Sequence, residues 1–171
     1  MRRIAVLLLC CASTAAVAAP GASAAVRCAG ASQTIEQLGP DGSRHATLCA
    51  LNSERARHGL PALRLDSRLT GAAQGHSDDM VAHGYFAHGD FDARIRHSGW
   101  TRHRRSWMIA ENIGYGSGSM GTPAGIVDAW MHSAGHRANI LERRFHDIGI
   151  GVASGIPSGG GGATYSTDFG S

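Results

Sequence analysis

The sequence predicts an α+β fold in which helices pack against a small antiparallel sheet, and two observations predict it. Apolar residues recur at helical intervals in the first half of the chain, for example at Leu69, Ala73 and Met80. Near the end, apolar residues alternate with glycine over 148–152, and a glycine-rich turn leads into a second strand-like segment, 163–169. Helices followed by a hairpin favour a layered arrangement, and 171 residues suit one domain.

Residues 1–24 have the order of a secretory signal peptide. Arg2 and Arg3 precede an apolar run over 4–11, and small residues follow at 22–24. The run is too short to span a bilayer, and no other apolar run reaches 18 residues. We therefore expect a secreted, extracellular protein without a membrane span.

Removal of this leader changes the charge and the cysteine count. The formal charge falls from +3 to about +1, and so small a positive charge does not indicate nucleic-acid binding. A lipid anchor on Cys10 or Cys11 is disfavoured, because leucine or cysteine precedes each where a small residue is expected. Cys28 and Cys49 remain, and in an oxidising compartment they are expected to form a disulfide that ties the extension 25–42 to the first helix. Such a bond stabilises by roughly 3 kcal/mol.

Two helices are expected next along the chain. Ser43 is placed to cap a helix that runs to about His58, where a Gly-Leu-Pro sequence supplies a stop. Asp66 or Ser67 can cap a second helix, which ends at Gly84.

The middle of the chain alternates polar and glycine-rich stretches. The arginine-rich stretch 94–105 is interpreted as a connection. Residues 116–121 match a G-x-G-x-x-G pattern, but without a surrounding βαβ unit we interpret them as a plain flexible loop. Thr122 and Pro123 suit the N-cap and first position of a helix that runs through Met131.

The chain has ten histidines, and their sequence surroundings indicate which of them are candidates for catalysis or metal binding. His76 lies on the apolar face of the second helix and is interpreted as a core histidine with its polar edge satisfied. His83 stands at a helix end, where an imidazole can meet free carbonyls. The histidines in polar or arginine-rich surroundings are expected at the surface: His45, His58, His97, His103 and His146.

His132 and His136 stand four residues apart, a spacing that would let one helix face hold a metal ion. Ser133 and Gly135 are expected to break or cap the chain between them. We therefore interpret the segment as two pieces, with His136 facing a cleft and His132 facing solvent. His88, in a loop after an aromatic triplet, and Glu111, in a mostly apolar stretch, are the other unexplained polar residues, and a buried carboxylate is costly unless it is paired or liganded.

Six segments resemble, in order, the bacterial branch of the CAP superfamily, which comprises cysteine-rich secretory protein, antigen 5 and pathogenesis-related 1 domains. They are HATLCALNSERARHGLPALRLDSRLTGAAQGHSDDM, YFAHGD, AENIGYG, WMHSAGHRANIL, IGIGV and YSTDFG. The resemblance covers about 46–170 and assigns 43–171 to one CAP (SCP-like) domain. It implies a three-layer α-β-α sandwich with a central cleft, in agreement with the layered interpretation.

The resemblance also implies which residues line the cleft, where some members hold a divalent metal. His88 matches the family's first cleft histidine, Glu111 its glutamate, and His136 the histidine typical of the bacterial branch. Asn112 and Ser133 match the usual neighbours.

The sequence departs from the family pattern at several positions. Tyr165 is the best match to another cleft histidine of eukaryotic members, and Asp168 stands where glutamine is usual. Asp168 restores an acidic group to the cleft if its strand points it inward. Ala134 replaces a common proline, and His132 falls at a variable position.

Three functions fit these residues. The first is a secreted, monomeric binding module whose His88, Glu111 and His136 hold a divalent metal, zinc by preference, and a small or cell-envelope ligand. The second is a metal-dependent extracellular hydrolase with Glu111 as general base, or a metal-free one with Ser133 as nucleophile, although Ser133 is better interpreted as a helix cap. The third is a purely structural polar network.

Overall fold

The computed structural model describes residues 27–171, so the signal peptide predicted over 1–24 lies outside the described residues. Helices and strands follow one another along the chain in this order: α1 (Ile35–Arg57), β1 (Arg64–Leu65), α2 (Ser67–His83), α3 (Phe91–Ser98), β2 (Ile109–Gly116), the short 3-10 helix η1 (Gly118–Gly121), α4 (Pro123–His132), α5 (Ala134–Ile140), β3 (Asp147–Ser154) and β4 (Ala163–Gly170). Across residues 27–171, no helix combines the length and the apolar composition that a membrane crossing requires.

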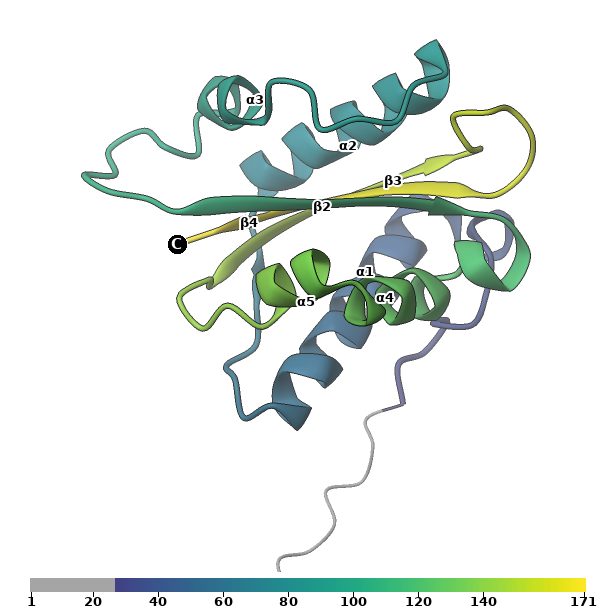
Figure 1. Ribbon diagram of the computed structural model, residues 1–171, viewed down its shortest axis with the longest axis horizontal. Coiled ribbons are helices and arrows are strands. Elements are labelled where there is room, and N and C mark those ends of the chain that lie inside the picture. Colours follow the sequence, from purple (N-terminus) through teal and green to yellow (C-terminus); the bar gives the residue numbers. More distant parts are fainter. Residues whose placement is uncertain (1–26) are drawn as a thin grey trace, which may run out of the picture.

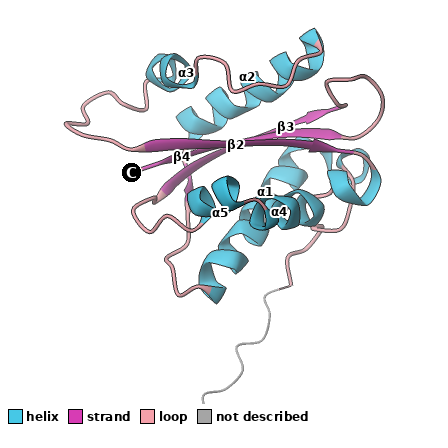
Figure 2. Ribbon diagram, in the orientation of Figure 1, coloured by secondary structure: helices cyan, strands magenta, loops and turns pink. Residues whose placement is uncertain are grey.

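The elements form three layers, as predicted. The central sheet has the strand order β1-β3-β4-β2, with α2 and α3 on one face and α1, α4 and α5 on the other (Figures 1 and 2). β2, β3 and β4 pair antiparallel, whereas β1 pairs parallel with β3, so the sheet is mixed rather than purely antiparallel. β1 escaped prediction because two residues are too short to show an alternating pattern.

The first helix begins earlier than predicted. It starts at Ile35, not Ser43, and is kinked at Gly39, which has a left-handed φ of 67°. The Gly-Pro pair suggested a turn, but Pro40 lies in the first turn after the kink, where its missing N–H costs nothing. Ser43 is consequently buried inside the helix instead of capping it.

The predicted disulfide is present. Cys28 and Cys49 are bonded, with their Cα atoms 5.6 Å apart. The bond ties the segment before α1 to the middle of that helix, as expected for the extension.

The caps of α2 and α4 are those that the sequence indicated. The Asp66 carboxylate accepts hydrogen bonds from the backbone N–H groups of Arg68 and Leu69, at 2.8 and 3.1 Å. Gly84 ends α2 in a left-handed conformation. Thr122 caps α4 by accepting from the N–H of Gly125 at 3.1 Å. These local signals suffice because each cap is satisfied within three residues.

Part of the stretch interpreted as a connection is in fact helix α3. Asp90 caps it by accepting from the N–H of Ala93 at 3.0 Å, and Gly99 ends it with a left-handed φ of 77°. Ile95 is its one fully buried residue, so its apolar face was too narrow to recognise among the arginines. The stretch 118–121, taken as a flexible loop, contains the short helix η1.

Glycines let α2 lie close to the sheet. A Cβ on Gly149 would come within 2.1 Å of the Leu69 backbone, and one on Gly151 within 2.2 Å of the Ala73 carbonyl oxygen. The alternation of glycine in β3 therefore brings the polar side chains of α2 against the sheet, where the candidate site lies.

Candidate ligand-binding cleft

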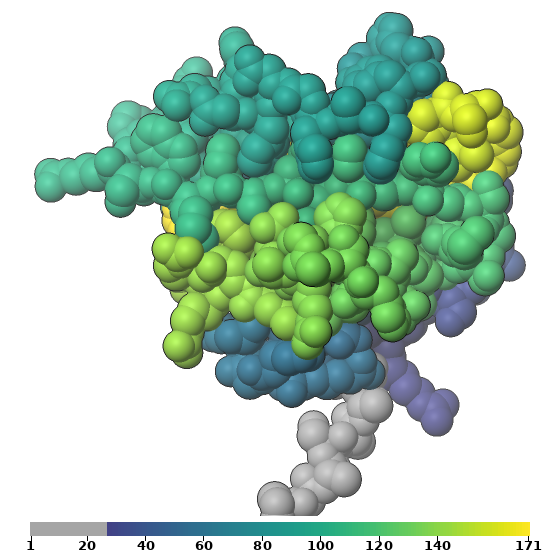
Figure 3. All heavy atoms as spheres, in the orientation of Figure 1, coloured from purple at the N-terminus to yellow at the C-terminus, as the bar shows by residue number. Residues whose placement is uncertain are grey.

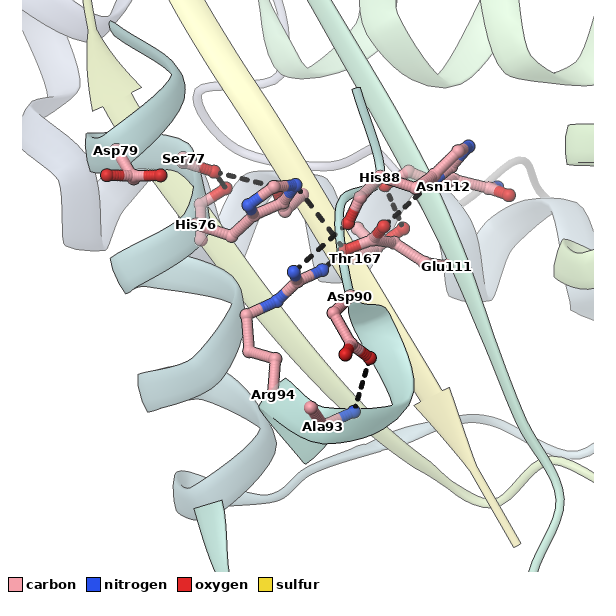
Figure 4. Close-up of polar contacts among 12 residues, drawn as sticks. His76, Ser77, Asp79, His88, Asp90, Ala93, Arg94, Glu111, Asn112 and Thr167 are labelled. Atoms are coloured by element: carbon pink, nitrogen blue, oxygen red, sulfur yellow. Dashed lines mark hydrogen bonds and ion pairs between the residues drawn. The ribbon is translucent and has the colours of Figure 1, made fainter. Parts of the chain in front are cut away.

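Glu111 is the centre of a polar cluster on the edge strand β2. Its side chain is only 2% exposed, yet it carries a carboxylate. One oxygen is 2.6 Å from Nδ1 of His88, and the other accepts a hydrogen bond from the guanidinium of Arg94 (Figure 4). The sequence predicted that His88 and Glu111 share a cleft, and the structure brings them into direct contact. We call this set of Glu111, His88, Arg94, His76 and Asp168 the Glu111 cluster.

Arg94 comes from the unpredicted helix α3. Its side chain also donates to the backbone carbonyl of His88 at 3.1 Å, so one guanidinium holds both the carboxylate and the loop that carries the histidine. A cation beside a buried carboxylate offsets much of the cost of removing that charge from water. Several arginines surround Arg94 in the sequence, and no local signal distinguished it from them.

His76 belongs to the cluster as well, which corrects its interpretation as a core histidine with a satisfied polar edge. It is 4% exposed, and its Nε2 has no hydrogen-bond partner among residues 27–171. That nitrogen lies 4.0 Å from a carboxylate oxygen of Glu111. Burial, and secondarily the charge of Arg94, lower the pKa of His76, so its imidazole is held neutral against the cluster.

Asp168 points inward, onto the same face of the sheet as Glu111. The two residues are direct partners in the pairing of β2 with β4, and such partners share a face. Asp168 is fully buried, and neither of its carboxyl oxygens has a hydrogen-bond partner within the described residues. Burial first, and the nearby Glu111 second, raise the pKa of Asp168 well above its ordinary value. Two carboxyl groups in one dry site cannot both ionise readily, so Asp168 is the member that keeps its proton.

We expect Asp168→Asn to stabilise the protein at pH 8 by about 1 kcal/mol, because an amide removes the ionisable group and donates permanently to Glu111. A carboxyl group with a raised pKa contributes stability at low pH and loses it as the pH rises through the folded-state pKa. The advantage of the variant should therefore shrink toward pH 4. Urea unfolding of both proteins from pH 4 to 8 checks this result. A constant difference across that range contradicts it.

Asn112 connects the other face of β2 to α5. Its side chain, fully buried, donates to the backbone carbonyl of His136 at 3.1 Å and accepts from the Asn139 amide at 2.9 Å. Asn139 also donates to the Glu111 carbonyl at 3.3 Å. Asn112 was predicted at the cleft from the sequence, whereas Asn139, which follows His136 at helical spacing on the same short helix, was not.

His136 lies at the cleft beside β2, half-buried, and no contact joins its imidazole to Glu111 within the described residues. Its ring centroid is 6.4 Å from that of Trp130. Burial chiefly, with His88 nearby, lowers the pKa of His136. The two histidines thus approach the same edge from opposite sides, one from the α2–α3 segment and one from α5.

Ser133 and His132 occupy the positions predicted for them. Ser133 lies at the junction of α4 and α5, in an extended conformation, although its hydroxyl makes no capping hydrogen bond. The side chain of His132 is 78% exposed, and its Nδ1 lies 2.8 Å from the backbone carbonyl oxygen of Asp128 on the same helix. The two histidines spaced four apart therefore lie on different helices, as predicted from the sequence.

Tyr165 does not join the cleft, which corrects its assignment. Successive residues of a strand point to opposite faces, and Tyr165 is three positions from Asp168. It is fully buried on the α1–α4 side, where its hydroxyl donates to the Gly121 carbonyl at 2.8 Å. Its ring packs edge-on against Trp130 at 6.5 Å.

The predicted zinc ligands do not fit a metal site as they are arranged. Across residues 27–171, no three His, Cys, Asp or Glu side chains converge closely enough to hold a metal ion. Glu111 is already engaged by a guanidinium and by His88, and a cation beside the carboxylate opposes a second one. The backbone carbonyl of His136, and not its ring, takes part in the hydrogen bonds around β2, where it accepts from the Asn112 side chain.

Open surface reaches the cluster from two sides. In Figure 3 the atoms of β2 form a band between the α2–α3 segment above and α5 below. A groove of about 740 Å³ lies between α2 and α3, and both His76 and Arg94 line it. His76 and Arg94 thus connect this groove to the buried carboxylate of Glu111.

Helices on both faces of a small sheet, with a His/Glu cluster at its edge strand, define the class of protein: an α-β-α sandwich domain with a polar cleft. The family model described as CAP, the cysteine-rich secretory protein family, matches residues 48–165. The chain belongs to this family, and the resemblance found in the sequence is confirmed.

Relatives and solved structures agree with this membership. The chain is 39% identical over 106 residues to Bacillus subtilis (strain 168) YkwD, which is described as an uncharacterized protein, and covers 40% of it. The alignment spans 61% of this chain. It is 33% identical over 106 residues to the uncharacterized membrane protein YlbC of the same organism, across 59% of this chain and 29% of that protein. The chain thus spans less than half the length of these two relatives.

Two crystal structures share the fold. An extracellular protein containing an SCP domain from Bacillus anthracis str. Ames matches with a TM-score of 0.62 and 27% identity, over 76% of this chain and 40% of that one. A cysteine-rich secretory protein from Staphylococcus aureus matches with a TM-score of 0.60 and 20% identity, over 77% of this chain and 38% of that one. The second likeness supports the fold alone.

Proposed function

We propose that this protein is a secreted CAP-domain binding module whose cleft along β2 takes a small ligand or a component of the cell envelope. One observation carries the proposal: the Glu111 carboxylate is buried at an edge strand and held there by Arg94 and His88. Hydrophobic residues of similar volume would stabilise the fold as well or better, so a charged cluster beside an open groove supports a role in recognition.

The geometry of the cluster suits binding. Glu111 and Arg94 are fixed by their contacts, whereas the His88 side chain is 54% exposed and offers its second nitrogen to solvent. Binding sites are usually built in this way, with rigid buried side chains that hold an exposed polar group in position. Secretion is supported by the predicted leader 1–24 and by the description of the Bacillus anthracis relative as an extracellular protein.

The hydrolase alternative finds less support. Both oxygens of Glu111 already accept hydrogen bonds, so no free base is aimed at an open position. Ser133 makes no hydrogen bond to His136 within residues 27–171, so a serine nucleophile lacks its base. We therefore assign no catalytic step to these residues.

The test is a titration of the ¹⁵N-labelled secreted protein with solubilised fragments of bacterial cell envelope. We expect amide shifts at Glu111, Asn112 and His136. These shifts should disappear in His88→Ala and persist in His132→Ala, the matched exposed control. If no fragment shifts these amides, the cluster is structural and the proposal fails.

The metal version is tested separately by zinc calorimetry. We expect the heat of zinc addition to be the same for the wild-type protein and for His88→Ala, because Arg94 already occupies the Glu111 carboxylate. Stoichiometric zinc binding that is lost in both His88→Ala and His136→Ala would restore the three-ligand site.

A further inference from the structure

β2 is an edge strand, so half of its backbone groups point away from the sheet. Two side-chain contacts show which half. The Glu111 carbonyl accepts from Asn139 at 3.3 Å, and the Ile113 carbonyl accepts from the indole N–H of Trp130 at 3.0 Å. Odd-numbered residues of β2 therefore direct their carbonyls outward, while Asn112 and Gly114 pair with β4.

The N–H groups of the same residues point outward too, because in an antiparallel ladder each residue directs its N–H and C=O to the same side. The N–H groups of Glu111 and Ile113 have no side-chain or loop acceptor within the described residues. Their carbonyls, by contrast, are occupied. At Glu111 and Ile113 this edge therefore presents unpaired donors beside carbonyls that each already accept one hydrogen bond, and buried donors left unpaired cost about 1–3 kcal/mol each.

The charges around this edge do not oppose an anion. Glu111 is paired with Arg94, and Asp168 keeps its proton because burial raises its pKa. His88 and His136 flank the edge from opposite sides. The cleft thus carries no uncompensated negative charge that would repel an acidic group.

The spacing of the donors sets the size of the ligand. Two residues along a strand separate the Glu111 and Ile113 N–H groups by about 7 Å, too far for one carboxylate to bridge. An extended peptide could present carbonyls at that interval. Its own N–H groups, however, would meet carbonyls already occupied by Asn139 and Trp130, at a cost of about 1–3 kcal/mol for each one left unpaired.

An exposed aromatic pair lies at the far end of the same strand. Phe86 and Tyr115 are 45% and 44% exposed, and their rings pack edge to face with centroids 4.8 Å apart. Exposed aromatic surface beside a polar cleft marks a binding surface, and ring faces attract the polarised C–H groups of a sugar.

We propose that the β2 edge binds an acidic saccharide of at least two rings. Oxygens on neighbouring rings, a carboxylate among them, accept from the N–H groups of Glu111 and Ile113, and one of these rings packs on Phe86 and Tyr115. This inference rests on the proposed function and names its ligand class.

Amide hydrogen exchange tests the free edge. In the free protein, the Glu111 and Ile113 amides should exchange at least tenfold faster than those of Asn112 and Gly114, which pair with β4. Saturation with trigalacturonate should slow the first two tenfold or more, whereas its methyl ester should not. Equally slow exchange at all four positions would show that the edge is sealed and would overturn the proposal.

Calorimetric titration tests the ligand class. Trigalacturonate or a disaccharide containing N-acetylmuramic acid should bind at least tenfold tighter than its methyl ester, and the tighter acid identifies the source of the sugar. Tyr115→Ala and Phe86→Ala should each weaken binding at least fivefold, and Leu65→Ala, an exposed apolar control on the opposite edge strand β1, should not. Equal binding of the acid and its methyl ester, or binding of a neutral extended peptide in their place, would show that the ligand is not an acidic saccharide. If envelope fragments still bind in a His88-dependent manner, the proposed function survives that refutation.

Discussion

Glu111→Gln is expected to lower the free energy of unfolding by about 3 kcal/mol, because it leaves the guanidinium of Arg94 without its carboxylate partner in a largely buried position. Arg94 is 19% exposed and Glu111 2%, so solvent screens little of this interaction. Urea unfolding at pH 7 measures the loss. Binding of the envelope ligand should fall with it, because the single amide oxygen of glutamine cannot accept from both His88 and Arg94.

Two controls make this prediction specific. The double variant Glu111→Leu, Arg94→Leu removes both charges and should recover most of the lost stability, since neither partner is left uncompensated. Glu142→Gln breaks the ion pair with Arg144, whose side chain is 66% exposed, and should have little effect. If Glu111→Gln lowers the free energy of unfolding no more than Glu142→Gln does, the ion pair does not hold the Glu111 cluster together.

Arg55→Leu is expected to cost about 4 kcal/mol, because it leaves buried carbonyls without donors. Arg55 is fully buried, and its guanidinium donates to the carbonyls of Pro61, Ile140, Glu142 and Phe145 at 2.7–3.1 Å. These bonds join α1 to the end of α5 and the turn that follows it. Thermal or urea unfolding measures the effect.

The matched control is Arg57→Leu, two residues along the same helix. Arg57 is 59% exposed, and Glu54 is its one side-chain polar partner among residues 27–171, so its removal should leave stability nearly unchanged. Because α5 carries His136, Arg55→Leu should also broaden or shift the His136 resonances. Equal stabilities of the two variants would contradict the anchoring role of Arg55.

Features decided within a few residues were predictable from the sequence. The caps at Asp66 and Thr122 follow from side chains that bond to nearby backbone groups. The strands β3 and β4 were predicted from the alternation of apolar residues with glycine and from the strand-like segment after it. Glu111 was predicted as a site residue because a carboxylate is unusual in an apolar stretch. The disulfide follows from a lone cysteine pair after the leader.

Features that depend on distant partners were not predictable. Arg94 resembles its neighbouring arginines until α3 folds and places it on Glu111. His76 looks like a core residue until glycines in β3 bring α2 close enough to face the carboxylate. Tyr165 was assigned to the cleft by resemblance, and the phase of β4 places it on the opposite face.

The central claim is that the Glu111 cluster recognises a ligand through His88. The most direct measurement is the ratio of dissociation constants for the bound envelope fragment between His88→Ala and His132→Ala, at equal protein stability. His88 is 54% exposed, so its loss should leave the fold intact while removing the cleft's exposed polar contact. We predict at least tenfold weaker binding in His88→Ala and no change in His132→Ala. Equal affinity in the two variants would contradict the account.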